Sequence, residues 1–322
     1  MKQTITRNFL LIVLALAVVF AFAMKATIFQ QPPTQKPTTT ATSADFSGYW
    51  FGGKAELNSY TLEQAQYGAL HPGEAVMIFV TEDFRTDKQV KAETPESRDK
   101  AVPVLKTNIS KKFVTGIYDY SLFTSIFTPI NSGIDNPALF PNTLKVSTSG
   151  QEWCGHSYLQ LNYQNNGYRI TGRSYFEKEV DEDYTVGKAM LEDELWNRIR
   201  LNPEKLPTGE IQLIPGTMAA RLRHKKLDPL PAKLKIDNYE GVLYPGKFLK
   251  SYVIEYPTDD RTLTIIFESQ FPHKIVGWEE IYKSKDNLLT SRAVLKKTIL
   301  TDYWNHNAPA DSTLRKTLLS NR

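Results

Sequence analysis

The sequence contains few side chains of the kinds that form disulfides, bind metals or mark known catalytic motifs. Its 322 residues include one cysteine and five histidines. A single cysteine excludes an intramolecular disulfide, and scattered histidines do not give the paired ligand spacing of a zinc site. The motifs GxSxG, HExxH, GxGxxG and the P-loop are absent from the sequence. We therefore expect no metal and no cofactor.

The sequence also lacks a concentration of charge of one sign. Lys and Arg total 39 and Asp and Glu total 35, so the net charge is only +4. Because binding to a phosphate backbone needs a clustered basic surface, we expect no nucleic-acid partner. Hydrophobic residues make up 41% of the chain, an ordinary globular value, and the 16 Tyr, 16 Phe and 5 Trp favour β-structure.

The N-terminal segment has the pattern of an export signal. Lys2 and Arg7 precede an unbroken apolar run at residues 9–24. Small residues at Ala21 and Ala23 fit cleavage by signal peptidase. The alternative is an uncleaved anchor, because extending the run to Phe29 gives about 20 residues, enough to span a bilayer. Both alternatives export the rest of the chain, and the anchor would make the membrane a partner.

The remaining sequence predicts a mainly β protein. Apolar and aromatic segments separated by turn residues predict long antiparallel hairpins that form a curved sheet or an open half-barrel. Residues 186–201 predict one amphipathic helix packed on that sheet, ended by Asn202 and Pro203. The predicted parts are a signal or anchor (1–29), a Pro/Thr-rich disordered linker (30–45), an N-terminal lobe (46–223), a second linker (224–235) and a C-terminal β-meander (236–322).

The sequence predicts strands in some segments, loops in others, and leaves one segment ambiguous. Strands are predicted at residues 74–84, within 104–128 and in the meander hairpins, whereas residues 59–68 fit either a helix or a strand. Charged residues 85–102 and the Pro-, Asn- and Gly-rich residues 129–142 predict loops.

The stretch at residues 144–179 contains the only cysteine and reads as a long hairpin. If Asn166 and Gly167 form its type I′ turn, Tyr158 faces Tyr175, His156 faces Glu177 and Cys154 faces Glu179. Since side chains alternate along a strand, one face then holds the polar and reactive groups. These are Glu152, Cys154, His156, Tyr158, Arg173, Tyr175, Glu177 and Glu179.

Several hypotheses compete for this face. A hydrolase would use Cys154 as nucleophile and His156 as base, oriented by Glu177 or Glu152. A metal would take Cys154, His156, Glu177 and Glu179 as ligands, and the acids at 177–183 suggest calcium, without the EF-hand pattern. A binding face would use Glu152, Tyr158, Arg173, Tyr175 and Glu179. The simplest alternative is an ordinary solvent-facing surface of a sheet.

Several segments resemble a family of exported proteins and lipoproteins of Gram-negative bacteria: FSGYWFGGKAELNSYTLEQAQYG, EAVMIFVTEDF, GIYDYSLFTSIFTP, SGQEWCGHSYLQLN and LPTGEIQLIPG. The resemblance covers most of residues 46–222 and implies a periplasmic location, tethered or soluble. Members often bear the label septum formation inhibitor Maf. Genuine Maf proteins are cytosolic nucleotide pyrophosphatases with an N-terminal SxSPRR loop, which this sequence lacks, and the lipid-bearing cysteine of the lipoprotein members is also missing.

The C-terminal segment FPHKIVGWEEIY resembles periplasmic half-barrel proteins of the lipoprotein-carrier type. That resemblance implies a fold, and the family implies no catalytic residues. Together these observations predict an exported, envelope-associated binding or structural protein, with a lipid, another apolar ligand or envelope proteins as partners. The alternative is an envelope hydrolase that uses Cys154 and His156.

Overall fold

The computed structural model describes residues 43–130 and 142–319. The predicted export segment and most of the predicted linker at 30–45 lie outside the described residues. Among the residues that are described, no helix is long and apolar enough to cross a membrane. The first described element is helix α2 (Ser43–Trp50), which includes the predicted start of folded sequence at Phe46.

The described strands are β1 (Ala55–Gln66), β2 (Ala69–Arg85), β3 (Val90–Lys91), β4 (Ala101–Thr115), β5 (Tyr118–Pro129), β6 (Lys145–Glu152), β7 (Gly155–Gln164), β8 (Gly167–Ser174), β9 (Glu182–Gly187), β10 (Met190–Leu191), β11 (Gly209–Ile214), β12 (Leu230–Asn238), β13 (Leu249–Tyr256), β14 (Arg261–Glu268), β15 (Ile275–Ser284) and β16 (Asn287–Thr301). The other helices are α3 (Pro95–Arg98), α4 (Glu192–Leu201), α5 (Thr217–Leu222) and α6 (Ser312–Leu319), and short 3-10 turns lie at η1 (Pro203–Lys205), η2 (Tyr303–Asn305) and η3 (Pro309–Asp311).

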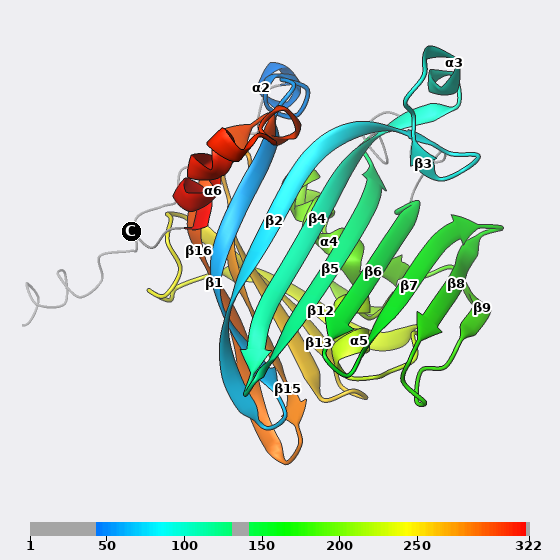
Figure 1. Ribbon diagram of the computed structural model, residues 1–322, viewed down its shortest axis with the longest axis vertical. Helices are drawn as coiled ribbons and strands as arrows, with labels where there is room; N and C mark the ends of the chain where they lie inside the picture. The colour runs from blue at the N-terminus through cyan, green and yellow to red at the C-terminus, as the bar shows by residue number, and fades with distance from the viewer. Residues whose placement is uncertain (1–42, 131–141, 320–322) are drawn as a thin grey trace, which may run out of the picture. The chain divides into compact units, whose positions relative to one another are not determined.

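The strands form one large, curved and unclosed sheet, as the sequence predicts (Figure 1). Its order is β10-β11-β12-β13-β14-β15-β16-β1-β2-β4-β5-β6-β7-β8-β9, and β3 pairs with β2. All neighbouring strands are antiparallel except β10 and β11. The turns at 67–68, 116–117, 153–154 and 285–286 therefore lie at one end of the sheet, which we call the tip end.

The first and last long strands meet in the middle of the sheet. β1 pairs with β16, with a bulge where the partner of Ser59 is Lys297 and the partner of Tyr60 is Leu295. The predicted linker at 224–235 is itself partly a strand, because β12 begins at Leu230 and pairs with β11 on one side and β13 on the other. The two predicted lobes thus share one continuous set of backbone hydrogen bonds.

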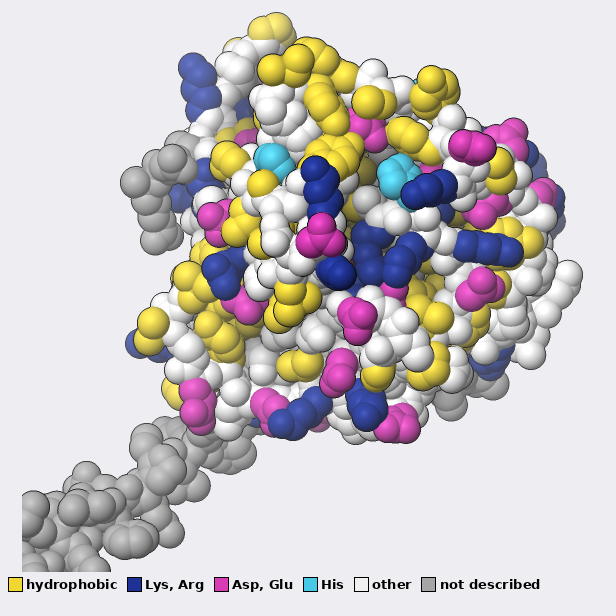
Figure 2. Space-filling view, turned by 90° about the horizontal axis from the view of Figure 1, so that it is seen from below, with side chains coloured by type: hydrophobic (Ala, Val, Ile, Leu, Met, Phe, Trp, Pro, Cys, Tyr) yellow, Lys and Arg dark blue, Asp and Glu magenta, His cyan; other side chains and the backbone are white. Residues whose placement is uncertain are grey.

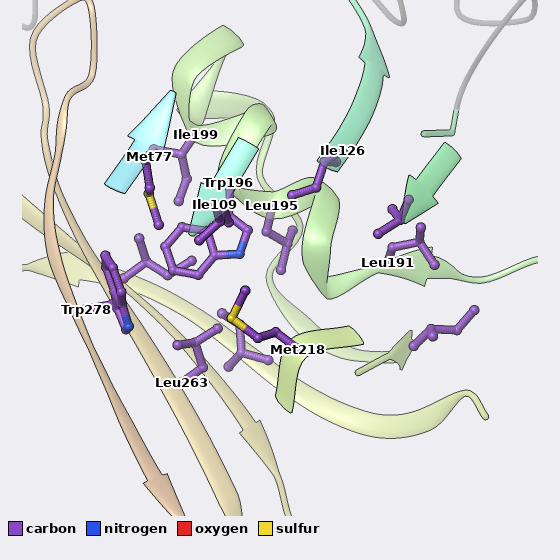
Figure 3. Packing of buried hydrophobic residues seen from close by; sticks show 14 of the residues in the cluster. Met77, Ile109, Ile126, Leu191, Leu195, Trp196, Ile199, Met218, Leu263 and Trp278 are labelled. Atoms are coloured by element: carbon purple, nitrogen blue, oxygen red, sulfur yellow. The ribbon is translucent and has the colours of Figure 1, made fainter. Parts of the chain in front are cut away.

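Helices α4 and α5 lie inside the curve of the sheet, and we call the opposite surface of the sheet its outer face (Figure 1). Inward side chains from distant strands converge on α4. The rings of Trp196 and Trp278 are 5.5 Å apart in a T-shaped arrangement, and Met77, Ile109 and Met218 pack nearby (Figure 3). The concave side is therefore filled by a hydrophobic core rather than left open.

The predicted helix at 186–201 is correct at its end and wrong at its start. It ends at Leu201, as expected, but begins only at Glu192. Val186 continues strand β9, and Met190 and Leu191 pair in parallel with Leu213 and Ile214. Strand pairing, which the helical spacing of apolar residues does not reveal, therefore takes four of the first six residues of the predicted segment.

Two buried ion-pair networks lie under the helices. Arg200 forms a bidentate pair with Glu56 at 2.5 and 2.7 Å, with both side chains at 0% exposure. Arg261 binds Glu192 at 2.6 and 2.7 Å and Glu280 at 2.7 Å. Charges buried this deeply need such partners, and these two networks supply them to Arg200 and Arg261 within the apolar concave side.

Candidate binding face

The predicted hairpin consists of three strands rather than two. Residues 144–164 do not form one strand, because β6 ends at Glu152 and a two-residue turn of Trp153 and Cys154 leads into β7. β7 and β8 then form the hairpin through Asn165 and Asn166, with φ of 51° and 61°. Both turn residues adopt the left-handed conformation that a type I′ turn requires, so the turn begins one residue earlier than predicted.

The earlier turn changes the cross-strand pairs between β7 and β8, but it leaves each side chain of these strands on the predicted face of the sheet. Tyr158 pairs with Arg173, not with Tyr175, and the backbone of Tyr175 bonds to that of His156. The predicted pairs of Tyr158 with Tyr175 and of His156 with Glu177 are therefore wrong by two residues. Because a two-residue shift preserves alternation, the four residues that the prediction placed together on the strands remain on the outer face of the sheet. They are His156, Tyr158, Arg173 and Tyr175.

The other predicted site residues lie elsewhere. Cys154 is an exposed turn residue, and Glu152 takes an inward position opposite Gly155 at the end of β6. Glu177 is exposed in the loop after β8, whereas Glu179 turns inward and is only 3% exposed. The predicted pair of Cys154 with Glu179 is therefore wrong. The register places Tyr175 beside His156, where the hydrolase hypothesis required a carboxylate.

Glu179 belongs to a buried polar cluster that sequence reasoning missed. Its carboxylate is bonded to His224 Nδ1 at 2.8 Å, Arg221 Nη1 at 2.9 Å and Ser174 Oγ at 2.6 Å. Burial raises the pKa of Glu179, but the bonds from His224 and Ser174 and the charge of Arg221 outweigh burial, so the pKa lies below its usual value. Ser174 ends β8, Arg221 lies in α5 and His224 follows α5. Because Arg221 and His224 are distant from Glu179 in sequence, no local signal predicts this cluster.

The basic residues near this cluster are paired. Lys and Arg side chains gather near the middle of the tip end, among hydrophobic and acidic ones (Figure 2). In the structure, Arg223 and Lys225 both pair with Asp259, and Arg221 pairs with Glu179. These cations therefore stabilise the loops at this end and do not form a free anion site.

On the outer face of β5, β6 and β7, three consecutive rows between Asp119 and Lys145 contain no Asp, Glu, Lys or Arg. Cross-strand pairing arranges nine outward positions as three rows of three. We call this set the neutral patch: Ser121, Gln151 and His156; Phe123, Ser149 and Tyr158; Ser125, Ser147 and Gln160. None of the nine is Asp, Glu, Lys or Arg, whereas the outward residues of β12 include Lys233, Lys235 and Asp237.

Hydrogen bonds hold the amides of this surface in place. Tyr158 Oη donates to Gln160 Oε1 at 2.7 Å, and Gln160 Nε2 donates to Asn162 Oδ1 at 2.6 Å. Asn162 Nδ2 in turn donates to Gln89 Oε1 at 2.6 Å, and Gln89 Nε2 donates to the backbone of Tyr163 at 2.7 Å. Burial is the main cause that raises the pKa of Tyr158, so its hydroxyl is neutral at physiological pH and keeps the proton that it donates to Gln160.

The neutral patch adjoins two open hollows. One, of about 380 Å³, is lined by Gln151, Trp153 and His156 together with Asp119 and Ser121. The second, of about 600 Å³, shares Asp119 and Ser121 with the first and extends toward Lys112 and Glu74. By contrast, the cavity under α4 and α5 measures about 30 Å³, room for about one water molecule. Space for a ligand therefore lies outside the sheet.

The residues that the structure describes contain no group of three or more His, Cys, Asp or Glu that could hold a metal ion. No protein-family model matches the chain, and a search of curated proteins found no relative. The functional assignment therefore depends on the geometry of the outer face.

Proposed function

We propose that the protein is an exported, envelope-associated binding protein that holds its ligand against the outer face of β5–β7. The observation that supports this proposal is the neutral patch with its adjoining hollows. None of the nine neighbouring outward positions is Asp, Glu, Lys or Arg, although a surface that only faces water usually carries such residues. The patch also exposes aromatic rings, with Phe123 at 41% and Tyr158 at 40% exposure.

The outer face is a better binding surface than the concave side. An apolar ligand inside the half-barrel would have to displace α4 and α5, whose side chains Leu195, Trp196 and Met218 are 0%, 7% and 7% exposed. It would also separate Arg261 from Glu192, leaving charges unpaired in an apolar core. The outer face needs no such rearrangement.

Photo-crosslinking of the full chain in cells tests this function. The photoreactive amino acid p-benzoylphenylalanine would replace Tyr158 in one variant and Thr264, an outward residue of β14, in the control. We expect adducts with an envelope component from position 158 and not from position 264. Equal adducts from both positions, or none from 158, would contradict the proposal.

A further inference from the structure

The chemistry of the neutral patch identifies the class of its ligand. We infer that the patch binds a neutral glycan chain. This inference rests on the proposed function and specifies its ligand.

The separation of the two exposed rings is the first observation. Phe123 and Tyr158 both pair with Ser149, on opposite sides of β6. Since neighbouring strands lie about 4.8 Å apart, the two rings are anchored roughly 10 Å apart across the sheet, with a small serine between them. That separation is close to the length of a disaccharide, so alternate sugars of one chain can place their C–H faces on the two rings.

The hydrogen-bonding groups are the second observation. Four serines surround the rings, and Gln151, His156 and Gln160 complete the patch. Hydroxyl, amide and imidazole groups both donate and accept hydrogen bonds, as sugar hydroxyls do. The bond from Tyr158 to Gln160 and that from Gln160 to Asn162 fix the amide orientation before a ligand arrives, which reduces the entropy lost on binding.

Other ligand classes fit this surface less well. A nucleic acid or acidic polysaccharide needs clustered Lys or Arg. The nine positions hold neither, and the cations that border them, Lys112 beside Ser121 and Arg173 beside Tyr158, lie on opposite sides of the patch. The buried centre of a protein interface is enriched in aromatic residues, Met and Arg and depleted in Ser, whereas four of these nine residues are serine. A lipid chain needs an aliphatic groove, and no Leu, Ile, Val or Met lies among the nine positions.

Trp153 extends the same surface toward the tip end. Its side chain is 67% exposed and lines the 380 Å³ hollow together with Gln151 and His156. Its ring lies 6.4 Å from that of Tyr118, which holds it beside the hollow. A glycan crossing the two central rings would occupy the patch, and the hollow would accept a branch or a neighbouring sugar.

Calorimetric titration of the purified full chain in mild detergent tests this inference. The probes are hexasaccharides of β-1,4-linked glucose, β-1,4-linked N-acetylglucosamine and α-1,4-linked glucose. We expect saturable binding to at least one of them. Phe123→Ala and Tyr158→Ala should each weaken it about tenfold, and Ser149→Glu should abolish it by placing a charge between the rings.

Matched variants elsewhere on the surface are the controls. Phe51→Ala removes a ring that is 51% exposed outside the neutral patch, and Thr264→Glu adds a charge on the outward side of β14. Both should bind like the wild type, and all variants should keep its thermal unfolding temperature. Binding that survives the patch substitutions, or no binding to any probe, overturns the glycan inference. If photo-crosslinking at position 158 still captures an envelope protein, the proposed function stands and only the ligand class is wrong.

Discussion

At the scale of single residues, the most unusual group is the carboxyl of Asp193. Its side chain is buried next to α5, and its Oδ2 accepts a bond from the backbone of Thr217 at 2.9 Å. Burial is the main cause that raises its pKa from 3.8 to about 7, and the bonds from Thr217 oppose it. The charged carboxylate of Asp193 is therefore destabilising in the folded protein, whereas in the unfolded chain the group has the usual pKa of an aspartate.

This shift predicts a pH-dependent effect of Asp193→Asn. Between about pH 4 and pH 7 the folded state holds a proton that the unfolded chain has released, so the wild type loses stability as the pH rises through this range. Asparagine resembles the protonated form at every pH. The variant should therefore gain about 3 kcal/mol in the free energy of unfolding at pH 8 and little at pH 4. Urea unfolding at both pH values measures this, and an equal effect at both would contradict it.

The buried pair of Arg200 and Glu56 gives a second prediction at this scale. Arg200→Met leaves the carboxylate of Glu56 buried without its cation, which should cost about 3–5 kcal/mol. The control is Arg169→Met, because the pair of Arg169 with Asp183 is also bidentate but exposed. Thermal unfolding should show a large loss for the first variant and little change for the second. Similar losses in both would argue against the role of burial.

At the scale of elements, the turn between β7 and β8 sets the register of the outer face. Asn166 has φ of 61°, which costs an alanine about 1 kcal/mol more than an asparagine or glycine. Asn166→Ala should therefore lower the free energy of unfolding by about that amount, whereas Asn166→Gly should leave it nearly unchanged. Denaturant unfolding measures the free energy of unfolding of both variants. If the alanine and glycine variants lose equal stability, the left-handed backbone of Asn166 is not the cause of the loss.

Strand prediction succeeded where alternation was clear and failed where pairing partners decided the outcome. The strand predicted at 74–84 and the four-stranded meander at the C-terminus are confirmed. The ambiguous segment at 59–68 lies largely in β1, since its neighbours β2 and β16 supply hydrogen bonds on both sides. The predicted loop at 85–102 contains β3 and α3, while most of the predicted loop at 129–142 lies outside the described residues.

At the scale of the whole molecule, the sheet joins the two predicted lobes. β1 lies between β16 and β2, so this first strand depends on the last long strand for the hydrogen bonds along one of its two edges. Helix α4 also contacts core residues from both halves, including Ile109 and Trp278. We therefore expect the two segments to behave as one folding unit.

A cleavable chain tests this expectation. A protease site inserted between Asp228 and Pro229 lies in a loop between α5 and β12. After cleavage, the two pieces should remain together during size-exclusion chromatography under native conditions and separate only in denaturant. An uncleaved chain with the same insertion is the control. Separation without denaturant would show that the lobes fold independently.

The sequence by itself determined the β-rich class, the long antiparallel hairpins and the outward position of His156, Tyr158, Arg173 and Tyr175. These features follow from local alternation and turn chemistry, which each segment carries within itself. Only the tertiary structure decided the filling of the concave side, the inward turn of Glu179 onto Arg221 and His224, and the neutral patch. Each of these depends on contacts between residues from different strands or loops, and a one-dimensional pattern does not specify which strands become neighbours.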